Sequence, residues 1–205
     1  MKLPKIREVI EAVKSLVLGP YTSKFPKVPH EPAEGFRGKA LFYEEDCVGC
    51  GACAEVCPAR AIAVEEELQD GNKGIRRLTL RHTKCIFCGQ CERNCITKKG
   101  VKLTTEYELS TFKKEEVSST VEKALVFCES CSMPITAYDH IKWMADRVGT
   151  LTFTNPTLYL TAMKDLDLID KGSEPIPDGT HKRSDQIKIL CPHCRRETTL
   201  SEAWG

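Results

Sequence analysis

Eight cysteines between residues 47 and 95 constrain this chain more than any other feature, because they form two runs with one spacing. Both runs read C-x2-C-x2-C-x3-C, and they consist of Cys47, Cys50, Cys53, Cys57 and of Cys85, Cys88, Cys91, Cys95. Thiols at this density and spacing are typical of metal ligation. A disulfide framework or structural zinc is disfavoured, because the same four-cysteine pattern occurs twice.

The spacing is the bacterial-type signature of a pair of 4Fe-4S clusters. Three closely spaced thiolates can reach three iron corners of one cluster, but the fourth follows a turn of helix that carries the chain away, so it ligates the other cluster. We therefore predict cluster A on Cys47, Cys50, Cys53 and Cys95, and cluster B on Cys85, Cys88, Cys91 and Cys57. Ile96 stands where the first run has Pro58, so the turn after Cys95 is expected to differ.

The remaining four cysteines predict a third metal site. They form two further C-x2-C units, Cys128 with Cys131 and Cys191 with Cys194, each preceded by a strand-like run, at residues 124–127 and 187–190. A strand followed by C-x2-C, twice, is the zinc-ribbon or rubredoxin construction, in which two knuckles close on one ion. Four thiolates accept zinc or iron, and we expect zinc in a structural role. His193 could replace a thiolate, but Cys194 fits the spacing better.

The 59 residues between these two knuckles are expected to hold two helices. Residues 134–148 place apolar side chains on one face at helical spacing. A second helix is expected to begin at Asn155-Pro156, where asparagine is an N-cap and proline takes the first helical position, and to end at Gly172. Its buried face would carry Tyr159, Met163, Leu166 and Ile169.

All twelve cysteines of the 205 residues lie in the two four-cysteine runs or in the two further C-x2-C units, which predicts a reducing compartment. Charged residues follow Met1 directly and no apolar run approaches the ~20 residues of a membrane span, so neither a signal peptide nor a membrane-spanning helix is expected. The net charge of +1 hides opposite blocks: residues 41–70 hold one Lys/Arg against eight Asp/Glu, and residues 71–102 hold nine against one. Such blocks suit docking between protein subunits. The basic block lacks interleaved aromatics, so nucleic acid is not expected as a partner.

The segments around the cysteine runs have simple patterns. Residues 3–18 carry an apolar face at helical spacing with lysines and an arginine beside it, which favours an amphipathic helix on a membrane surface or membrane subunit, although packing on its own domain is the alternative. Residues 19–40 are rich in proline and glycine, which predicts an extended strap. Residues 61–65 and 75–81 are strand-like around a turn at 70–74. Arg76, Arg77, Arg81 and Lys84 are either a solvated strand face or an offset to the negative charge of the clusters.

Residues 36–95 resemble the two-cluster, I-type subunit of respiratory complex I. The resemblance lies in Phe36-Arg37-Gly38, Cys57-Pro58-Ala59-Arg60 and Cys85-Ile86-Phe87-Cys88-Gly89, and it extends to roughly residues 1–112. Residues 124–205 are similar to the longer forms found in group 4 membrane-bound nickel–iron hydrogenases, especially formate hydrogenlyase-type complexes. We therefore expect an α+β chain with four parts: helix and strap (1–40), two-cluster bacterial ferredoxin-like domain (41–112), connection (113–123), and zinc-ribbon or rubredoxin-like four-cysteine domain with a helical insert (124–205).

The resemblance implies a peripheral subunit on the cytoplasmic side of the cell membrane, with no catalytic site of its own, that relays electrons through two 4Fe-4S clusters. The implied partners are the small and large subunits of a hydrogenase-like or complex I-like oxidoreductase, a membrane-arm subunit near the N-terminal helix, and an electron donor such as reduced ferredoxin or a formate dehydrogenase module. A free soluble ferredoxin-type carrier, a subunit of NADH-quinone oxidoreductase proper and a scaffold are the alternatives.

Overall fold

The computed structural model describes residues 5–19, 22, 24–25, 27–69, 73–164 and 183–200. The chain divides into two units, Met1–Phe36 and Arg37–Gly205.

The first unit contains one helix, α1 (Ile6–Leu18), which confirms the helix expected at 3–18 over the residues that the structure describes. It begins with the Lys5 backbone N–H donating to Glu8 Oε2 at 3.0 Å and ends at Gly19, whose φ is 73°. The apolar side chains of α1 stay exposed within this unit, from 48% at Val9 to 86% at Leu16. After α1, residues 24–25 and 27–36 form no helix or strand, as the prolines predict.

No helix among the residues described is long and apolar enough to span a lipid bilayer.

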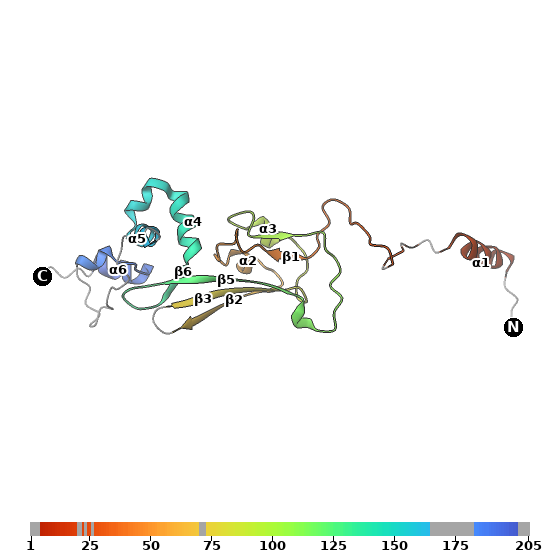
Figure 1. Cartoon of the computed structure of the whole chain (residues 1–205), viewed down its shortest axis with the longest axis horizontal. Helices are drawn as coiled ribbons and strands as arrows, with labels where there is room; N and C mark the ends of the chain where they lie inside the picture. Colours follow the sequence, from red (N-terminus) through yellow and green to blue (C-terminus); the bar gives the residue numbers. More distant parts are fainter. Residues whose placement is uncertain are drawn as a thin grey trace. The chain divides into compact units, whose positions relative to one another are not determined.

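Two antiparallel sheets build the second unit (Figure 1). The small sheet pairs β1 (Ala40–Phe42) with β4 (Val101–Leu103). The larger sheet has the strand order β2-β3-β5-β6, with bounds Ile62–Gln69, Lys73–Arg81, Ser118–Phe127 and Pro134–Ala137. Strands β2 and β3 confirm the two strands expected at 61–65 and 75–81. The 3-10 turn η1 (Lys114–Glu116) leads into β5.

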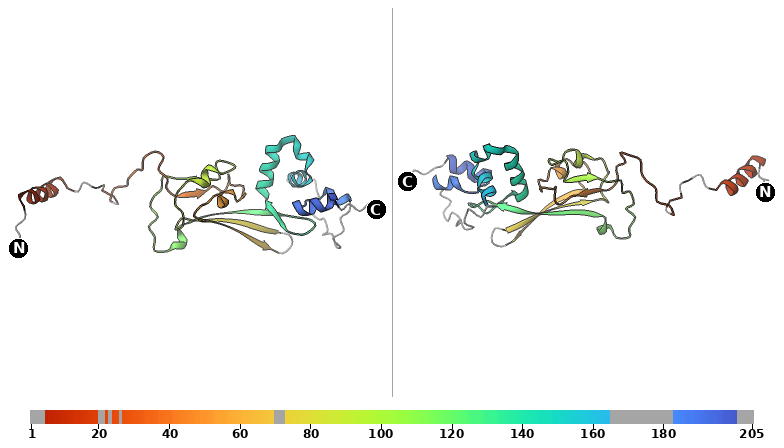
Figure 2. Two further views of the ribbon diagram at one scale, coloured as in Figure 1. Left: turned by 180° about the vertical axis from the view of Figure 1, so that it is seen from behind. Right: turned by 45° about the horizontal axis from the view of Figure 1, so that its top comes forward.

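The core that positions the cysteine runs lies between the two sheets. Buried side chains from five strands meet there, with exposures of 1 to 6%: Ala40, Ile62, Leu78, Leu80, Val101 and Val121. The short helices α2 (Ala52–Glu55) and α3 (Gln90–Arg93) lie with β1 on the same side of the larger sheet, as Figures 1 and 2 show. Cys53 is part of this core, and five of the other seven cysteines of the two runs pack against it.

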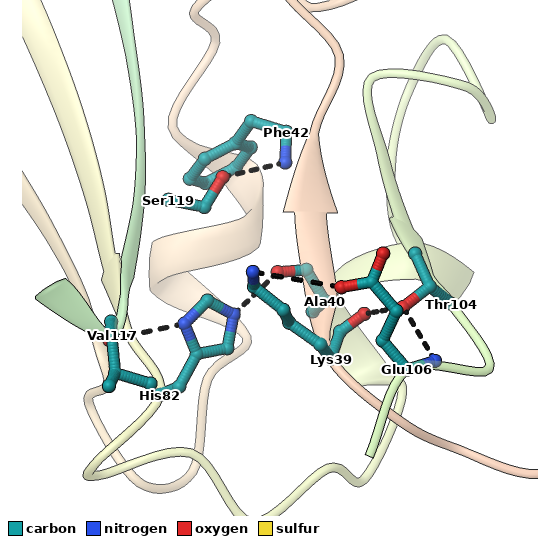
Figure 3. Close-up of polar contacts among 8 residues, drawn as sticks. All are labelled: Lys39, Ala40, Phe42, His82, Thr104, Glu106, Val117 and Ser119. Carbon is teal, nitrogen blue, oxygen red and sulfur yellow. Dashed lines mark hydrogen bonds and ion pairs between the residues drawn. The ribbon is translucent and has the colours of Figure 1, made fainter. Parts of the chain in front are cut away.

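A buried histidine fastens the small sheet to the larger one. His82 is 3% exposed, its Nε2 lies 2.7 Å from the Ala40 carbonyl oxygen, and its Nδ1 lies 3.2 Å from the Val117 carbonyl oxygen (Figure 3). A second bridge runs from the Phe42 amide to Ser119 Oγ at 3.0 Å. Both bridges tie β1 to the beginning of β5, since polar groups removed from water need partners.

Replacing His82 by leucine is expected to lower the free energy of unfolding by about 1–3 kcal/mol, because the buried Ala40 carbonyl loses this donor. Urea denaturation followed by circular dichroism measures the change. Ser119→Ala is the milder control, because the hydroxyl that it removes is half-buried and binds one amide. Equal stability of His82→Leu and the unmodified chain would show that the bridge is not needed.

Beyond β5 and β6, the described residues form three helices and two 3-10 turns, and Figure 2 shows the arrangement of the helices from two further sides. These are α4 (Tyr138–Val148), η2 (Gly149–Thr154), α5 (Pro156–Lys164), η3 (Arg183–Ile187) and α6 (Pro192–Leu200). The predicted N-cap is confirmed: Asn155 Oδ1 accepts the Thr157 amide at 3.0 Å, and Pro156 opens α5. Leu166, Ile169 and the predicted stop at Gly172 lie outside the described residues.

The structure corrects three sequence-based expectations. Residues 118–123, expected within a surface connection, belong to β5 and pair with β3. Residues 134–137, expected to begin a helix, form β6, because Pro134 suits the first position of an edge strand and the β-branched Ile135 and Thr136 favour extended backbone. Residues 187–190 are not a strand: η3 ends at Ile187 and residues 188–190 are irregular.

Candidate metal centres

Four cysteines of the predicted cluster A line one cavity. Cys47, Cys50, Cys53 and Cys95 reach this cavity from the first run and from the end of the second. Most of the other lining residues are apolar or glycine, and they include Phe42, Leu78, Ile96, Gly100 and Val101. The first three cysteines come from the loop ahead of α2 and from α2 itself, whereas Cys95 follows α3.

The cysteines of the predicted cluster B line a second cavity. The cysteines that line it are Cys57, Cys85, Cys88 and Cys91. Its other walls are formed by Ala40, Ala59, Ile62, Leu80, Ile86, Phe87, Gly89, Gln90 and Leu103. Helices α2 and α3 contact each other. The two cavities are therefore neighbours, and each takes one cysteine from the other run.

Equivalent positions of the two runs have the same backbone conformation. Gly51 and Gly89 precede α2 and α3 with φ of 79° and 77°, a left-handed conformation that glycine adopts without steric strain. Two residues earlier, Gly49 and Phe87 also have positive φ, 68° and 53°. The residue equivalent to Gly49 in the second run is Phe87, so this left-handed conformation does not require glycine in both runs.

The turns after the two fourth cysteines are also alike. Three residues past Cys57 and Cys95, Arg60 and Lys98 have φ of 46° and 61°. The Arg60 amide donates to the Cys57 carbonyl at 3.1 Å, and the Lys98 amide donates to the Cys95 carbonyl at 3.0 Å. The expectation of a different turn after Cys95 is wrong, because Ile96 adopts this turn without the proline.

Hydrogen bonds and burial set the properties of the cysteine sulfurs. The amides of Ala61 and Phe87 donate to Cys57 Sγ and Cys85 Sγ at 3.3 and 3.4 Å. Burial raises the pKa of Cys53 to about 12 and that of Cys91 to about 11. Without metal these thiols are protonated at neutral pH, so metal binding must displace their protons.

Cys95 differs from the other buried ligands. Burial acts to raise its pKa, but hydrogen bonds from Thr97 and from the amides of Val101 and Gly100 outweigh burial and leave the pKa lowered. The Thr97 hydroxyl lies 3.3 Å from Cys95 Sγ. Four cysteines in an otherwise mainly apolar cavity, with amide and hydroxyl donors on the sulfurs, fit a 4Fe-4S cluster in each site.

The third group of cysteines also converges. The Sγ atoms of Cys128, Cys131, Cys191 and Cys194 all lie within 4.8 Å of one another, and those of Cys131 and Cys191 are 3.8 Å apart. A tetrahedral ion with Zn–S bonds of about 2.3 Å separates its sulfurs by about 3.8 Å, so the site fits zinc. His193 is not part of it, because its ring is 77% exposed and lies 3.5 Å from Glu197.

The two knuckles of this site are built differently. The first follows β5 directly and is closed by the Ser132 amide, which donates to the Cys128 carbonyl at 2.9 Å. In the second, Cys191 precedes α6 and Cys194 lies in its first turn, with the Cys194 amide 3.4 Å from Cys191 Sγ. Pro192 takes the first position of α6. Proline is common at this position of a helix, and the prediction of a strand at residues 187–190 did not take it into account.

Two side chains join the knuckles to each other and to α5. Glu129 donates its amide to the Ile189 carbonyl at 2.8 Å and accepts the Ile189 amide on Oε2 at 3.0 Å. Arg195 donates to the carbonyls of Gln186 and Lys188, at 2.5 and 2.7 Å, and to Thr157 Oγ1 at 2.9 Å. Residues 186–190 are thus held by side chains, which explains why they do not need a strand partner.

Comparisons with known proteins bear on the two cysteine runs between residues 47 and 95. A family profile described as "4Fe-4S dicluster domain" matches residues 46–99. The chain is 34% identical over 130 residues to NADH-quinone oxidoreductase subunit I 2 of Geobacter metallireducens, which covers 61% of this chain and 98% of the relative. It is 37% identical over 130 residues to formate hydrogenlyase subunit 6 of Escherichia coli, which covers 63% of this chain and 70% of the relative.

Among solved structures, a chain of the membrane-bound sulfane sulfur reductase, an archaeal respiratory membrane complex, is 29% identical with a TM-score of 0.39, over 57% of this chain and 61% of that one. The dicluster profile spans both cysteine runs and accounts for two 4Fe-4S clusters. The metal of the third site and the assignment of individual cysteines to cluster A or cluster B stay predictions.

Proposed function

This chain belongs to the family of 4Fe-4S dicluster subunits that includes complex I subunit I and formate hydrogenlyase subunit 6, and from this premise we propose that it relays electrons inside a membrane-bound oxidoreductase of the hydrogenase or formate hydrogenlyase type. When bound, each cluster supplies one-electron redox chemistry. The observation that carries the proposal is the pair of adjacent cavities, each lined by four cysteines and otherwise mainly by apolar residues and glycine.

The protein's own residues bind, insulate and tune. Cys47, Cys50, Cys53 and Cys95 are proposed to hold cluster A, and Cys85, Cys88, Cys91 and Cys57 are proposed to hold cluster B. The mainly apolar walls limit contact with water, and the amides on Cys57 and Cys85 donate to sulfur. Burial and hydrogen bonds of this kind set cluster potentials, which span about −700 to +450 mV in such centres.

The helix α1 is proposed to rest on a membrane-arm subunit of the complex. Its apolar face is exposed within its own unit, and Leu16 reaches 86%. Lysines and an arginine border this face at positions 5, 7 and 14. An amphipathic helix of this composition suits an anionic surface at the edge of a bilayer, which supports a peripheral position on the cytoplasmic side of the cell membrane.

The third site is proposed to hold one zinc ion with a structural role. The 3.8 Å between Cys131 Sγ and Cys191 Sγ supports tetrahedral thiolate ligation. The site joins two knuckles that Glu129 also connects through its hydrogen bond from the Ile189 amide. Thiolate-rich sites of this kind contribute folding energy outright.

Anaerobically prepared full-length protein is expected to contain about eight irons and eight acid-labile sulfides per chain, since each cluster contributes four of each. Redox titration followed by EPR is expected to give two reducible S = 1/2 centres. Far less iron or sulfide would exclude the relay.

Copurification from solubilised membranes separates the alternatives. A nickel–iron hydrogenase large subunit supports the hydrogenase-type complex, and a quinone-site subunit with NADH-oxidising partners supports complex I proper. A chain that is monodisperse alone and associates with neither is a free carrier.

A further inference from the structure

The loop of each cluster offers a backbone carbonyl to an arginine. In the loop of cluster A, the Gly49 carbonyl accepts a hydrogen bond from Arg76 Nη1 at 3.0 Å. In the loop of cluster B, the Cys88 carbonyl accepts one from Arg37 Nη1 at 3.1 Å. The two arginines differ in their surroundings. The side chain of Arg76 is only 13% exposed, whereas the contact of Arg37 is at the surface.

Three groups hold the guanidinium of Arg76 in place. On β2, Glu66 Oε1 accepts hydrogen bonds from Arg76 Nε at 3.0 Å and from Arg76 Nη2 at 2.5 Å. On β6, Thr136 Oγ1 accepts a hydrogen bond from Arg76 Nη1 at 3.2 Å, and the same hydroxyl oxygen lies 3.0 Å from His140 Nδ1 of α4. The third group is the Gly49 carbonyl. Arg76 therefore bridges the cluster A loop to β6, which belongs to the region that carries the four-cysteine site.

The loop of cluster A packs tightly against that region. A Cβ atom built on Gly49 would lie 3.0 Å from Ala137 Cβ and 3.0 Å from Lys123 Cγ. Lys123 Nζ donates to the Glu44 carbonyl at 2.8 Å and pairs with Asp139 at 2.8 Å. A side chain at position 49 would crowd Ala137 and Lys123, so the cluster A loop packs directly against β5 and β6.

We infer that Arg76 is a positioning residue that raises the reduction potential of cluster A, and that Thr136 of the four-cysteine region holds it in place for this purpose. The inference rests on the proposed function. Reduction adds one negative charge to a cluster, and a mostly buried positive charge nearby favours the reduced form. The Gly49 carbonyl belongs to the peptide bond of the ligand Cys50, so the arginine also polarises a peptide unit next to the cluster.

The neighbouring Arg77 provides a matched control. Successive residues of a strand point to opposite faces of the sheet, and Arg77 pairs with Glu67 and Glu122 instead of the cluster loop. Both arginines thus lie on β3 and make cross-strand ion pairs. Of these two arginines, Arg76 donates to a carbonyl of a cluster loop, whereas Arg77 donates to carboxylates on the neighbouring strands.

The experiment is a redox titration of the full chain, loaded with iron and sulfide and followed by EPR. Arg76→Gln is expected to shift the ratio of reduced to oxidised cluster A about tenfold toward the oxidised form, or about 59 mV for one electron, and to leave cluster B unchanged. Glu66→Gln is expected to shift cluster A in the opposite direction, because it uncovers the guanidinium charge. Thr136→Val is expected to act like Arg76→Gln but more weakly.

The controls identify the cluster and exclude a general effect. Arg77→Gln is expected to leave both midpoints in place, and Arg37→Gln is expected to shift the midpoint that Arg76→Gln does not. Equal shifts of both clusters, or no shift with Arg76→Gln and Glu66→Gln at full iron content, would overturn the inference. If Arg76→Gln fails to load, Glu66→Gln and Thr136→Val decide by the sign of their shifts. An unmodified chain that binds far fewer than eight irons contradicts the proposed function instead.

Discussion

The Cys57→Ser variant is expected to lose the cluster bound by Cys85, Cys88 and Cys91, although Cys57 belongs to the first run in the sequence. Cys57 lines the cavity of those three cysteines, whereas Cys95 lines the cavity of the first run. Serine is a poor ligand for iron compared with a thiolate. We therefore expect iron content to fall from about eight to about four per chain, with one EPR signal left.

A double substitution shows which cluster is lost. If Cys57 serves cluster B, Cys57→Ser combined with Cys85→Ser still leaves about four irons, because both changes damage one cluster. If Cys57 serves cluster A, the combination damages both clusters and iron falls toward zero. The reciprocal pair, Cys95→Ser with Cys47→Ser, is the matched control and is expected to spare cluster B.

Cys191→Ser is expected to release the third metal and to unfold the region around it. Structural zinc binds with about 10–16 kcal/mol in small thiolate domains, which exceeds the stability of most domains of this size. Hydrogen exchange measured by mass spectrometry is expected to show lost protection over α6 and residues 128–133. Residues 118–124 are expected to stay protected, because they pair with β3.

His193→Ala is the matched control for this substitution. It changes the same knuckle, but its ring is exposed and pairs with Glu197, so protection and metal content are expected to stay as in the unmodified chain. Metal analysis is expected to find about one zinc per chain in addition to the iron of the clusters. Unchanged protection in Cys191→Ser would show that the metal does not hold this region together.

The sequence predicted those parts of the fold whose signals are local. The cysteine spacing, the strands flanking residues 70–74 and the N-cap at Asn155 each depend on a few neighbouring residues, and the structure has the two strands and the cap. The set of cysteines around each cavity also matches the spacing rule. The two strands and the cap could be predicted because their physical causes lie within about ten residues of chain. The cysteines around each cavity come from two separate runs, and their assignment to clusters A and B stays a prediction.

The rest depends on partners far away in the sequence. Residues 118–123 are mostly polar, and only Val121 among them is fully buried, so their pairing with β3 some forty residues earlier left no periodic signal. Ile189 and Leu190 look like a strand, but their burial comes from packing beneath α4, α5 and α6. The sequence left two roles open for Arg76, a position on a solvated strand face or an offset to the negative charge of the clusters. The choice depends on which face of β3 the cluster loop covers, and the sequence does not show this.

The strand β5 also limits where this chain can be shortened. It supplies the hydrogen-bonding partner of β3 over seven residue pairs and then continues to Cys128. A fragment that stops before residue 118 would expose one whole side of β3 as an open edge, and open edges pair with other chains and aggregate. Fragments intended to carry only the two clusters therefore need residues 118–124, even though that segment contributes no cysteine.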